Sequence, residues 1–501
     1  MKKYSLYIGL AGLMLAAASC SDPLNELPTQ SKVDGNLIVD QKTAQIALNG
    51  VYYQFAMCKV DNYDVESTGV ATYYEALPAD FAGVLGYYQG DYMLETHPGY
   101  YSSVYNLYIW QPLYKTVVAA NAVIDQLEGA NDAWFTTVSK SSIVAEARLM
   151  RAIAYTKLFE WFGYYWDQSS PYGLIIRDEA VTASNMPCGR STVSESYDFI
   201  LADLDYAIQN APDVNPNHYT NKWVAKGQKA RVLMMKGDYQ GAADLCADII
   251  SNSPYTLEER QTDIFHVKGL ASKEVMFGIQ PKERQTANYE EYYYRGSAQW
   301  LPTKNFATLY QDDPRMDTNF LHTVDSTLYL LYLAYLGLDM PELIVDSYIV
   351  CKHLDPTVLD ADDIEETNVE MRLTEFYLMR AEALAQMGYN TESIALLKTV
   401  LEHAGYTDFS TTADLAVDQH SLLEQIFNEY LRNLFCENGR ELSLMMRMPA
   451  DIVLAFNYNY ADESGTAINK QYSVLGIPAD EFSYNTALST SDQNPGYATS
   501  N

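Results

Sequence analysis

Basic residues are scarce in this chain of 501 residues, which has 33 Lys and Arg against 65 Asp and Glu and a formal net charge of −32. Nucleic acids need Lys and Arg to neutralise their phosphates, so this balance argues against DNA and RNA as partners. Strongly anionic ligands are disfavoured in the same way unless a basic pocket is local. The charge therefore favours neutral ligands.

Cysteine and histidine are also few. Apart from Cys20, five cysteines are spread widely, which is no disulfide framework, and the seven histidines lack metal-ligand spacing. The motifs G-x-S-x-G, H-E-x-x-H, G-x-G-x-x-G and the Walker loop do not occur. The sequence therefore predicts a protein that is not an enzyme, with no catalytic residue, no cofactor and no metal site.

Long apolar runs are confined to the start of the chain. Lys2 and Lys3 precede an apolar run from Tyr4 to Ala18, which is shorter than the roughly 20 residues of a membrane-spanning helix. A basic head, an apolar middle and small residues form an export signal. Because Cys20 follows directly, the stretch resembles a bacterial lipoprotein signal, with residues 1–19 removed and lipid attached to Cys20, although Ala17 replaces the usual Leu. Ordinary cleavage with an incidental Cys20 is the alternative.

Helical periodicity covers much of the remaining chain. Residues 20–40, with Pro23 and Pro28, form a tether, and 3–4 spacing of apolar residues begins near Thr43. Residues 58–111 and 262–365 lack this period, and the second stretch contains strand-like pieces at 274–279 and 347–351. Further helices are predicted at about 112–128, 140–163, 193–210, 222–236, 239–252, 368–387, 391–404 and 418–437.

Two helical segments resemble each other. Residues 226–250 and 377–401 each consist of a helix, a turn at Gly237 or Gly388, and a second helix, with small residues where the helices must touch. This pattern is typical of tetratricopeptide-type hairpins. The two copies are degenerate and far apart, so the sequence predicts a bundle of hairpins with long insertions rather than a regular solenoid.

Several short motifs occur in order along the chain. They are Leu48-Asn49-Gly50-Val51-Tyr52, Asn121 with Val123-Ile124-Asp125, Glu146-Ala147-Arg148 with Arg151-Ala152 and Ala154-Tyr155, the helix from Leu373 to Ala385, Asn428-Glu429 to Arg440-Glu441-Leu442 with Arg447, Ile477-Pro478 with Glu481, and Gln493-Asn494-Pro495-Gly496-Tyr497. Together these motifs resemble the SusD/RagB family of lipoproteins, which are the binding components of nutrient-uptake systems in the Bacteroidetes. Ser443, where the family has Asp, is a departure from its pattern.

The resemblance implies one mainly α domain over residues 41–501, built as a tetratricopeptide-like bundle of helical hairpins with loop-rich insertions and a few short strands. The hairpins would lie at about 112–252 and 368–437, and the ligand-side insertions at about 58–111 and 262–365. Charged residues of the hairpin helices are expected to bridge neighbouring helices by charge-assisted hydrogen bonds. These are Glu146, Arg148, Arg151, Glu382 and Arg440.

Tyrosine is unusually common, with 42 residues against 16 Phe and 6 Trp. An aromatic ring covers the apolar face of a sugar, while polar side chains take its hydroxyls. The resemblance implies that ligand residues come from the two insertions. The predicted aromatic platform is Tyr73, Tyr74, Tyr87, Tyr88, Tyr92, Tyr292, Tyr293 and Trp300, and the predicted polar contacts are Asp80, Gln89, Asn288 and Arg295.

The resemblance further implies a lipid-anchored protein of the outer membrane, facing the cell exterior. It would capture oligosaccharides and pass them to a SusC-like TonB-dependent transporter. Tyrosine-rich clefts also hold extended peptides, so a peptide-binding member of the family is an alternative. A lipoprotein glycoside hydrolase with a helical core is another, since spaced carboxylate pairs cannot be recognised in a sequence with this many acids.

Overall fold

The computed structural model describes residues 37–58, 71–87, 104–279, 300–322, 348–353, 368–407 and 418–497. Within these ranges the chain is mainly helical, with helical hairpins and three small sheets of two strands each. The predicted fold class, a tetratricopeptide-like bundle with a few short strands, is confirmed.

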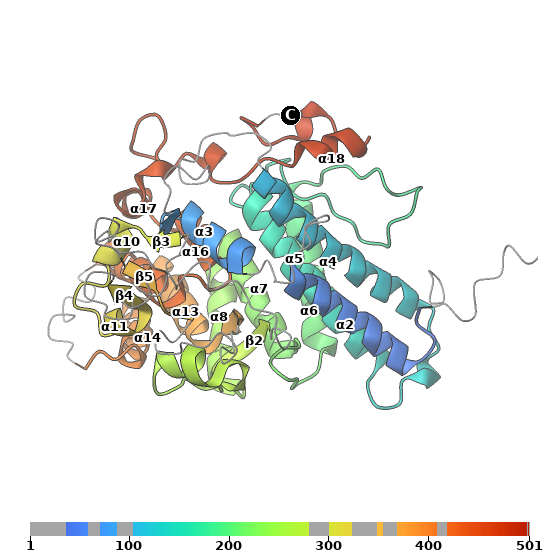
Figure 1. Ribbon diagram of the computed structural model, residues 1–501, viewed down its shortest axis with the longest axis horizontal. Helices are drawn as coiled ribbons and strands as arrows, with labels where there is room; N and C mark the ends of the chain where they lie inside the picture. The colour runs from blue at the N-terminus through green and yellow to red at the C-terminus, as the bar shows by residue number, and fades with distance from the viewer. Residues whose placement is uncertain are drawn as a thin grey trace, which may run out of the picture.

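Four long helices form the N-terminal part of the bundle, where α2 packs on α4, α4 on α5 and α5 on α6 (Figure 1). At the start of α2, the Asp40 carboxylate accepts a hydrogen bond from the Thr43 backbone N–H, and the Thr43 hydroxyl bonds back, as in a capping box. Thr192 and Glu195 form the same motif at α6. The helices are α2 (Gln41–Met57), α4 (Val104–Glu128), α5 (Lys140–Phe162) and α6 (Val193–Asn210).

The repeated segments fold as two similar hairpins, as predicted. Gly237 and Gly388 end the first helix of each hairpin with φ angles of 81° and 84°, a left-handed conformation that favours glycine. The hairpins are stacked, because the second helix of the first copy packs on the first helix of the second copy. They consist of α7 (Lys222–Lys236) with α8 (Tyr239–Asn252), and α13 (Leu373–Gln386) with α14 (Asn390–His403).

The last part of the chain returns to the N-terminal helices. The Asn106 side chain donates a hydrogen bond to the Gly476 carbonyl oxygen at 2.8 Å, and Asn494 donates to Phe162 and Leu475. As a result, α18 lies beside α4 (Figure 1). The C-terminal helices are α15 (Gln419–Leu434), α16 (Arg440–Arg447), α17 (Ala450–Phe456) and α18 (Ala479–Tyr484).

Short elements connect the long helices. Among the described residues the strands form three antiparallel pairs: β1 (Leu85–Tyr87) with β3 (Trp300–Pro302), β2 (Val275–Ile279) with β6 (Asn368–Arg372), and β4 (Phe320–His322) with β5 (Tyr348–Val350). The short helical turns are η1 (Ala71–Ala76), α3 (Leu77–Phe81), η2 (Asp132–Trp134), η3 (Asp263–Lys268), η4 (Gly269–Ala271), α10 (Lys304–Thr308), α11 (Met316–Asn319), η7 (Tyr458–Tyr460), η8 (Lys470–Tyr472) and η9 (Thr490–Asp492).

Two predicted helix boundaries differ from the structure. The helix predicted to begin near residue 112 begins at Val104, and Pro112 lies inside it, although proline usually marks a helix start. Residues 368–372, predicted as helix, form β6 and pair with β2. All five residues of this strand are buried, although Asn368, Glu370 and Arg372 alternate with two apolar residues. This period of two is typical of a strand, and the predicted helix did not take it into account.

Buried charges join neighbouring helices, as predicted. Arg151 of α5 donates to both carboxylate oxygens of Asp203 in α6, at 2.7 and 2.8 Å. Arg447 forms a similar bidentate ion pair with Glu382 of α13. The Glu146 carboxylate accepts a 2.7 Å hydrogen bond from the Tyr52 hydroxyl, and burial raises its pKa to about 7. These contacts fix the relative positions of the helices.

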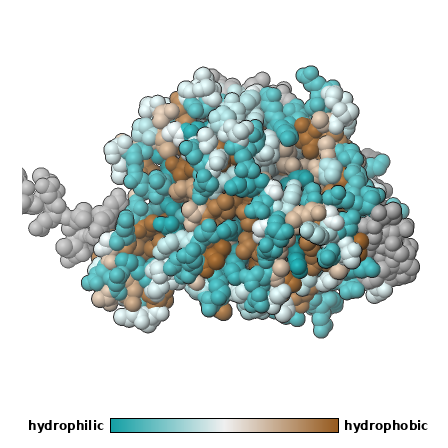
Figure 2. All heavy atoms as spheres, turned by 180° about the vertical axis from the view of Figure 1, so that it is seen from behind, coloured by the Kyte–Doolittle hydropathy of each residue, from teal (hydrophilic) through white to brown (hydrophobic). Residues whose placement is uncertain are grey.

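The surface is mostly hydrophilic on the face shown in Figure 2, where apolar side chains form patches separated by polar ones. Within the described ranges, no helix has the length and apolar character needed to cross a membrane. The five cysteines there are free, and Cys246 and Cys436 are fully buried, as their apolar sequence context predicts.

Candidate functional site

The two tyrosine-rich insertions are joined at a short β ribbon. Strand β1 ends at Tyr87, directly before residues 88–103, and β3 begins at Trp300, directly after residues 280–299. Tyr87 pairs with Trp300 in the antiparallel register, and their ring centroids are 5.3 Å apart. The stretch that follows β1 and the stretch that precedes β3, which are about 200 residues apart in the sequence, are therefore attached to the same ribbon.

Three of the predicted ligand residues are instead part of the interior. Trp300 and Tyr74 are each 2% exposed, and Asp80 is 1% exposed. The Tyr74 ring packs on Phe55 at 5.2 Å, and the Lys157 ammonium group lies 4.4 Å from its centroid. Side chains this deeply buried cannot contact a ligand, so these residues support the site rather than form its surface.

The other predicted residues divide into two groups. Tyr73 and Tyr87 are partly exposed, and Tyr73 packs edge-on against Tyr108 at 5.7 Å. The remainder lie outside the described residues, so their prediction stays untested. They are Cys20, Tyr88, Gln89, Tyr92, Asn288, Tyr292, Tyr293 and Arg295.

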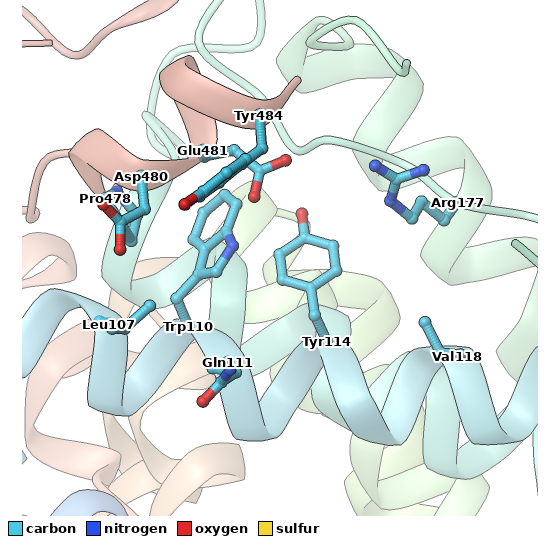
Figure 3. Close-up of a pocket in the computed structure, with 10 residues that line it drawn as sticks. All are labelled: Leu107, Trp110, Gln111, Tyr114, Val118, Arg177, Pro478, Asp480, Glu481 and Tyr484. Atoms are coloured by element: carbon cyan, nitrogen blue, oxygen red, sulfur yellow. The ribbon is translucent and has the colours of Figure 1, made fainter. Parts of the chain in front are cut away.

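A separate pocket of about 430 Å³ lies between α4 and α18 (Figure 3). Its volume is within the range of about 300–1,000 Å³ that is typical of small-molecule sites. Helix α4 supplies the floor, α18 supplies one wall, and Arg177, from the segment after α5, stands at one end. The lining residues are Leu107, Trp110, Gln111, Tyr114, Val118, Arg177, Pro478, Asp480, Glu481 and Tyr484.

The aromatic side chains on the floor of this pocket are packed against neighbouring groups. The Trp110 indole contacts the Tyr114 ring at 4.6 Å and the Phe162 ring, edge-on, at 4.9 Å. The Tyr114 hydroxyl donates a 2.9 Å hydrogen bond to the Ile175 carbonyl oxygen. Burial raises the pKa of Tyr114 well above its ordinary value, so this hydroxyl remains neutral.

The sequence interpretation did not single out Trp110, Tyr114 or Tyr484. A local signal exists for the first two, since residues four positions apart lie on the same face of a helix. Nothing local connects them to Tyr484, because α18 reaches α4 only through the packing of the C-terminal segment. No group of three or more His, Cys, Asp or Glu side chains in the described ranges could hold a metal ion.

Comparison with known proteins identifies the family. Residues 44–234 match the family model SusD-like_3, described as starch-binding and associating with the outer membrane, and residues 346–497 match SusD_RagB, the SusD family. The chain belongs to the SusD/RagB family. Members of this family are carbohydrate-binding proteins that associate with the outer membrane. The two matches include all the long helices of the hairpin bundle except α8, which lies between them.

Individual SusD-like proteins are similar over most of their length. The SusD-like protein P25 of Formosa agariphila is 24% identical over 431 residues, which are 77% of this chain and 79% of that protein. A SusD superfamily structure from Bacteroides thetaiotaomicron superposes with a TM-score of 0.69 at 21% identity, covering 91% of this chain and all of the other. A putative sugar binding protein from Bacteroides vulgatus gives 0.69 at 20% identity, with 92% and 100% coverage. The structural likeness shows the fold.

Proposed function

We propose that this SusD-like protein is a non-catalytic, cell-surface lipoprotein that binds oligosaccharides and passes them to a SusC-like TonB-dependent transporter. The observation that carries the proposal is the β1–β3 ribbon, which pairs a strand of one tyrosine-rich insertion with a strand of the other in a chain of a carbohydrate-binding family. The ligand surface would be formed by the tyrosines that follow β1 and precede β3.

The chemistry of these residues suits a neutral sugar. Tyr88, Tyr92, Tyr292 and Tyr293 would cover the apolar faces of successive sugar rings. Gln89, Asn288 and Arg295 would bond the hydroxyls. Tyr73 and Tyr87 would extend this surface at its base, and the buried ring of Trp300 would hold the ribbon in place. The strongly negative charge of the chain supports a neutral rather than an anionic glycan.

The binding of glycan is tested by a double substitution in the second insertion. Tyr292→Ala with Tyr293→Ala is expected to weaken the binding of a neutral oligosaccharide at least about tenfold, because two stacked rings are lost. Titration calorimetry on the wild type and variant measures the change. Tyr389→Ala removes a tyrosine that is 51% exposed and far from the ribbon in sequence, and serves as the control. Equal affinity in all three proteins would exclude this site.

Attachment to the membrane would be through Cys20 after removal of residues 1–19. Residues 20–40 would tether a single body, residues 41–501, to the outer face of the outer membrane. Cys20→Ala is expected to abolish incorporation of labelled palmitate and to release the protein from the membrane fraction, since no other lipid attachment is proposed. Labelling that persists in the variant would contradict the anchor.

A further inference from the structure

The pocket between α4 and α18 is distinct from the site proposed at the β1–β3 ribbon. None of its ten lining residues belongs to either strand or to the stretches 88–103 and 280–299 that adjoin the strands. In Figure 1, α18 lies near the C-terminus at the opposite side of the molecule from β3. A ligand in this pocket would therefore make contacts that the proposed oligosaccharide site does not provide.

Two aromatic side chains face this pocket, one of them buried and the other exposed. Trp110 is 6% exposed and is held by neighbouring rings, whereas Tyr484 is 80% exposed. Figure 3 shows both rings directed into the same space from opposite elements, α4 and α18. A tyrosine ring at a surface can offer its apolar face to a ligand while its hydroxyl stays in water. A fixed ring and an exposed ring on two sides of a pocket can enclose one flat ligand between them.

The exposed ring is nevertheless well positioned. Asn485, the residue after Tyr484, donates a hydrogen bond from its side chain to the Cys188 carbonyl oxygen at 2.8 Å and accepts one from the Cys188 backbone N–H at 3.0 Å. The segment before α18 is held by the bond from Asn106 to Gly476. Because both ends of α18 are fixed, the Tyr484 ring is placed beside the pocket before any ligand arrives.

The polar rim indicates the charge of the ligand. Asp480 and Glu481 contribute two carboxylates, and Glu481 accepts a 3.2 Å hydrogen bond from the Asn485 side chain. The Arg177 guanidinium group donates to the backbone oxygen of Met186 at 2.8 Å. Carboxylates accept hydrogen bonds from hydroxyls and repel anions. With two carboxylates against one guanidinium group, the rim has an excess of negative charge and suits a ligand with many hydroxyls and no negative charge.

We propose that this pocket is a second saccharide site, which binds one neutral pyranose unit between Trp110 and Tyr484. The choice of a saccharide rests on the proposed function of the chain, whereas the existence of a site rests on the pocket itself. Gln111, Asp480 and Glu481 would bond the ring hydroxyls. Binding at this site would let the protein hold one end of a glycan apart from the main site, or bind a short product.

The test uses the full-length protein, solubilised in a detergent without a sugar headgroup, that carries Tyr292→Ala and Tyr293→Ala. In this background the other proposed site is removed, so the result does not depend on it. The methyl glycosides of glucose, galactose and mannose are titrated and followed by saturation-transfer NMR. Adding Tyr484→Ala is expected to weaken the binding of a hexoside at least about fivefold, because one wall of the pocket is lost.

Two control variants and one charged ligand are added to this test. Tyr484→Phe keeps the ring and should retain affinity, while Tyr53→Ala removes a tyrosine that is 58% exposed on α2 and should change nothing. Glucuronate is expected to bind at least about fivefold more weakly than the neutral hexosides, because of the two carboxylates. The proposal is overturned if no hexoside binds, if Tyr484→Ala binds as tightly as its parent, or if glucuronate binds equally well.

The outcome separates the two proposed sites. Oligosaccharide binding that is weakened in the double variant, with hexoside binding retained, would support both sites. Oligosaccharide binding that is unchanged in the double variant would refute the ribbon site, while the effect of Tyr484→Ala on the hexosides would still decide the pocket.

Discussion

Replacing Arg372 with methionine is expected to lower the free energy of unfolding by about 3–5 kcal/mol, because it leaves buried carboxylates without their partner. Arg372 ends β6 and is 1% exposed. Its guanidinium group donates to Glu437 at 2.7 Å and to Glu274 at 2.9 Å, and it also bonds the Asn433 carbonyl oxygen at 2.8 Å. One side chain thus links the β2–β6 ribbon to the end of α15.

Arg372 stays positively charged in the folded protein. Burial alone would lower the pKa of Arg372, but the two carboxylates raise it above the ordinary value. Methionine fills similar space without the charge. The decrease in the free energy of unfolding would therefore come from the unpaired carboxylates rather than from a cavity. Urea unfolding gives the free energy.

The matched control is Arg260→Met. Arg260 pairs with Asp263 at 2.8 Å, but its side chain is 73% exposed, so we expect a loss below about 1 kcal/mol. A loss for Arg372→Met no greater than for this control would show that the network does not stabilise the fold.

Trp300→Ala is the second substitution with a large expected effect, a loss of about 3–5 kcal/mol in the free energy of unfolding. The Trp300 side chain is 2% exposed, packs on Tyr87 and belongs to the main hydrophobic core. Its removal would leave a cavity under the β1–β3 ribbon, at the base of both insertions. Urea unfolding again provides the measurement.

The control for this substitution is another tryptophan. Trp134, the last residue of η2, is 36% exposed, and its change to alanine is expected to cost less than about 1 kcal/mol. If Trp300→Ala were as stable as Trp134→Ala and lost only glycan affinity, Trp300 would be a ligand residue after all and its buried position would be contradicted.

Local signals explain which helices could be predicted from the sequence. The helices at 193–210, 222–236 and 239–252 have the predicted bounds, because Thr192, Asn221 and Asp238 cap their N-termini and Gly237 ends one of them. The prediction at Pro112 differs because a proline is tolerated inside α4. At 368–372 a local signal was present, since polar and apolar residues alternate there, and the helix was predicted against it.

The residues of the candidate site could be predicted from the sequence less well than the helices. The sequence grouped residues by their proximity along the chain, which is how Tyr73 and Tyr74 were placed on one surface. In the structure Tyr74 is interior while its neighbour is partly exposed, because successive residues of a helical turn face different directions. The pairing of Tyr87 with Trp300, and the placement of Trp110 and Tyr484 around one pocket, depend on the packing of distant segments that no local pattern encodes.

The central claim is that the protein binds glycans without cleaving them. Titration calorimetry of the purified protein with neutral oligosaccharides of several lengths, in parallel with extended peptides, tests it most directly. The account predicts saturable binding of at least one oligosaccharide that weakens with Tyr292→Ala and Tyr293→Ala, no binding of the peptides, and no steady heat of hydrolysis. Binding of peptides alone, or a sustained heat of turnover with oligosaccharides, would contradict it.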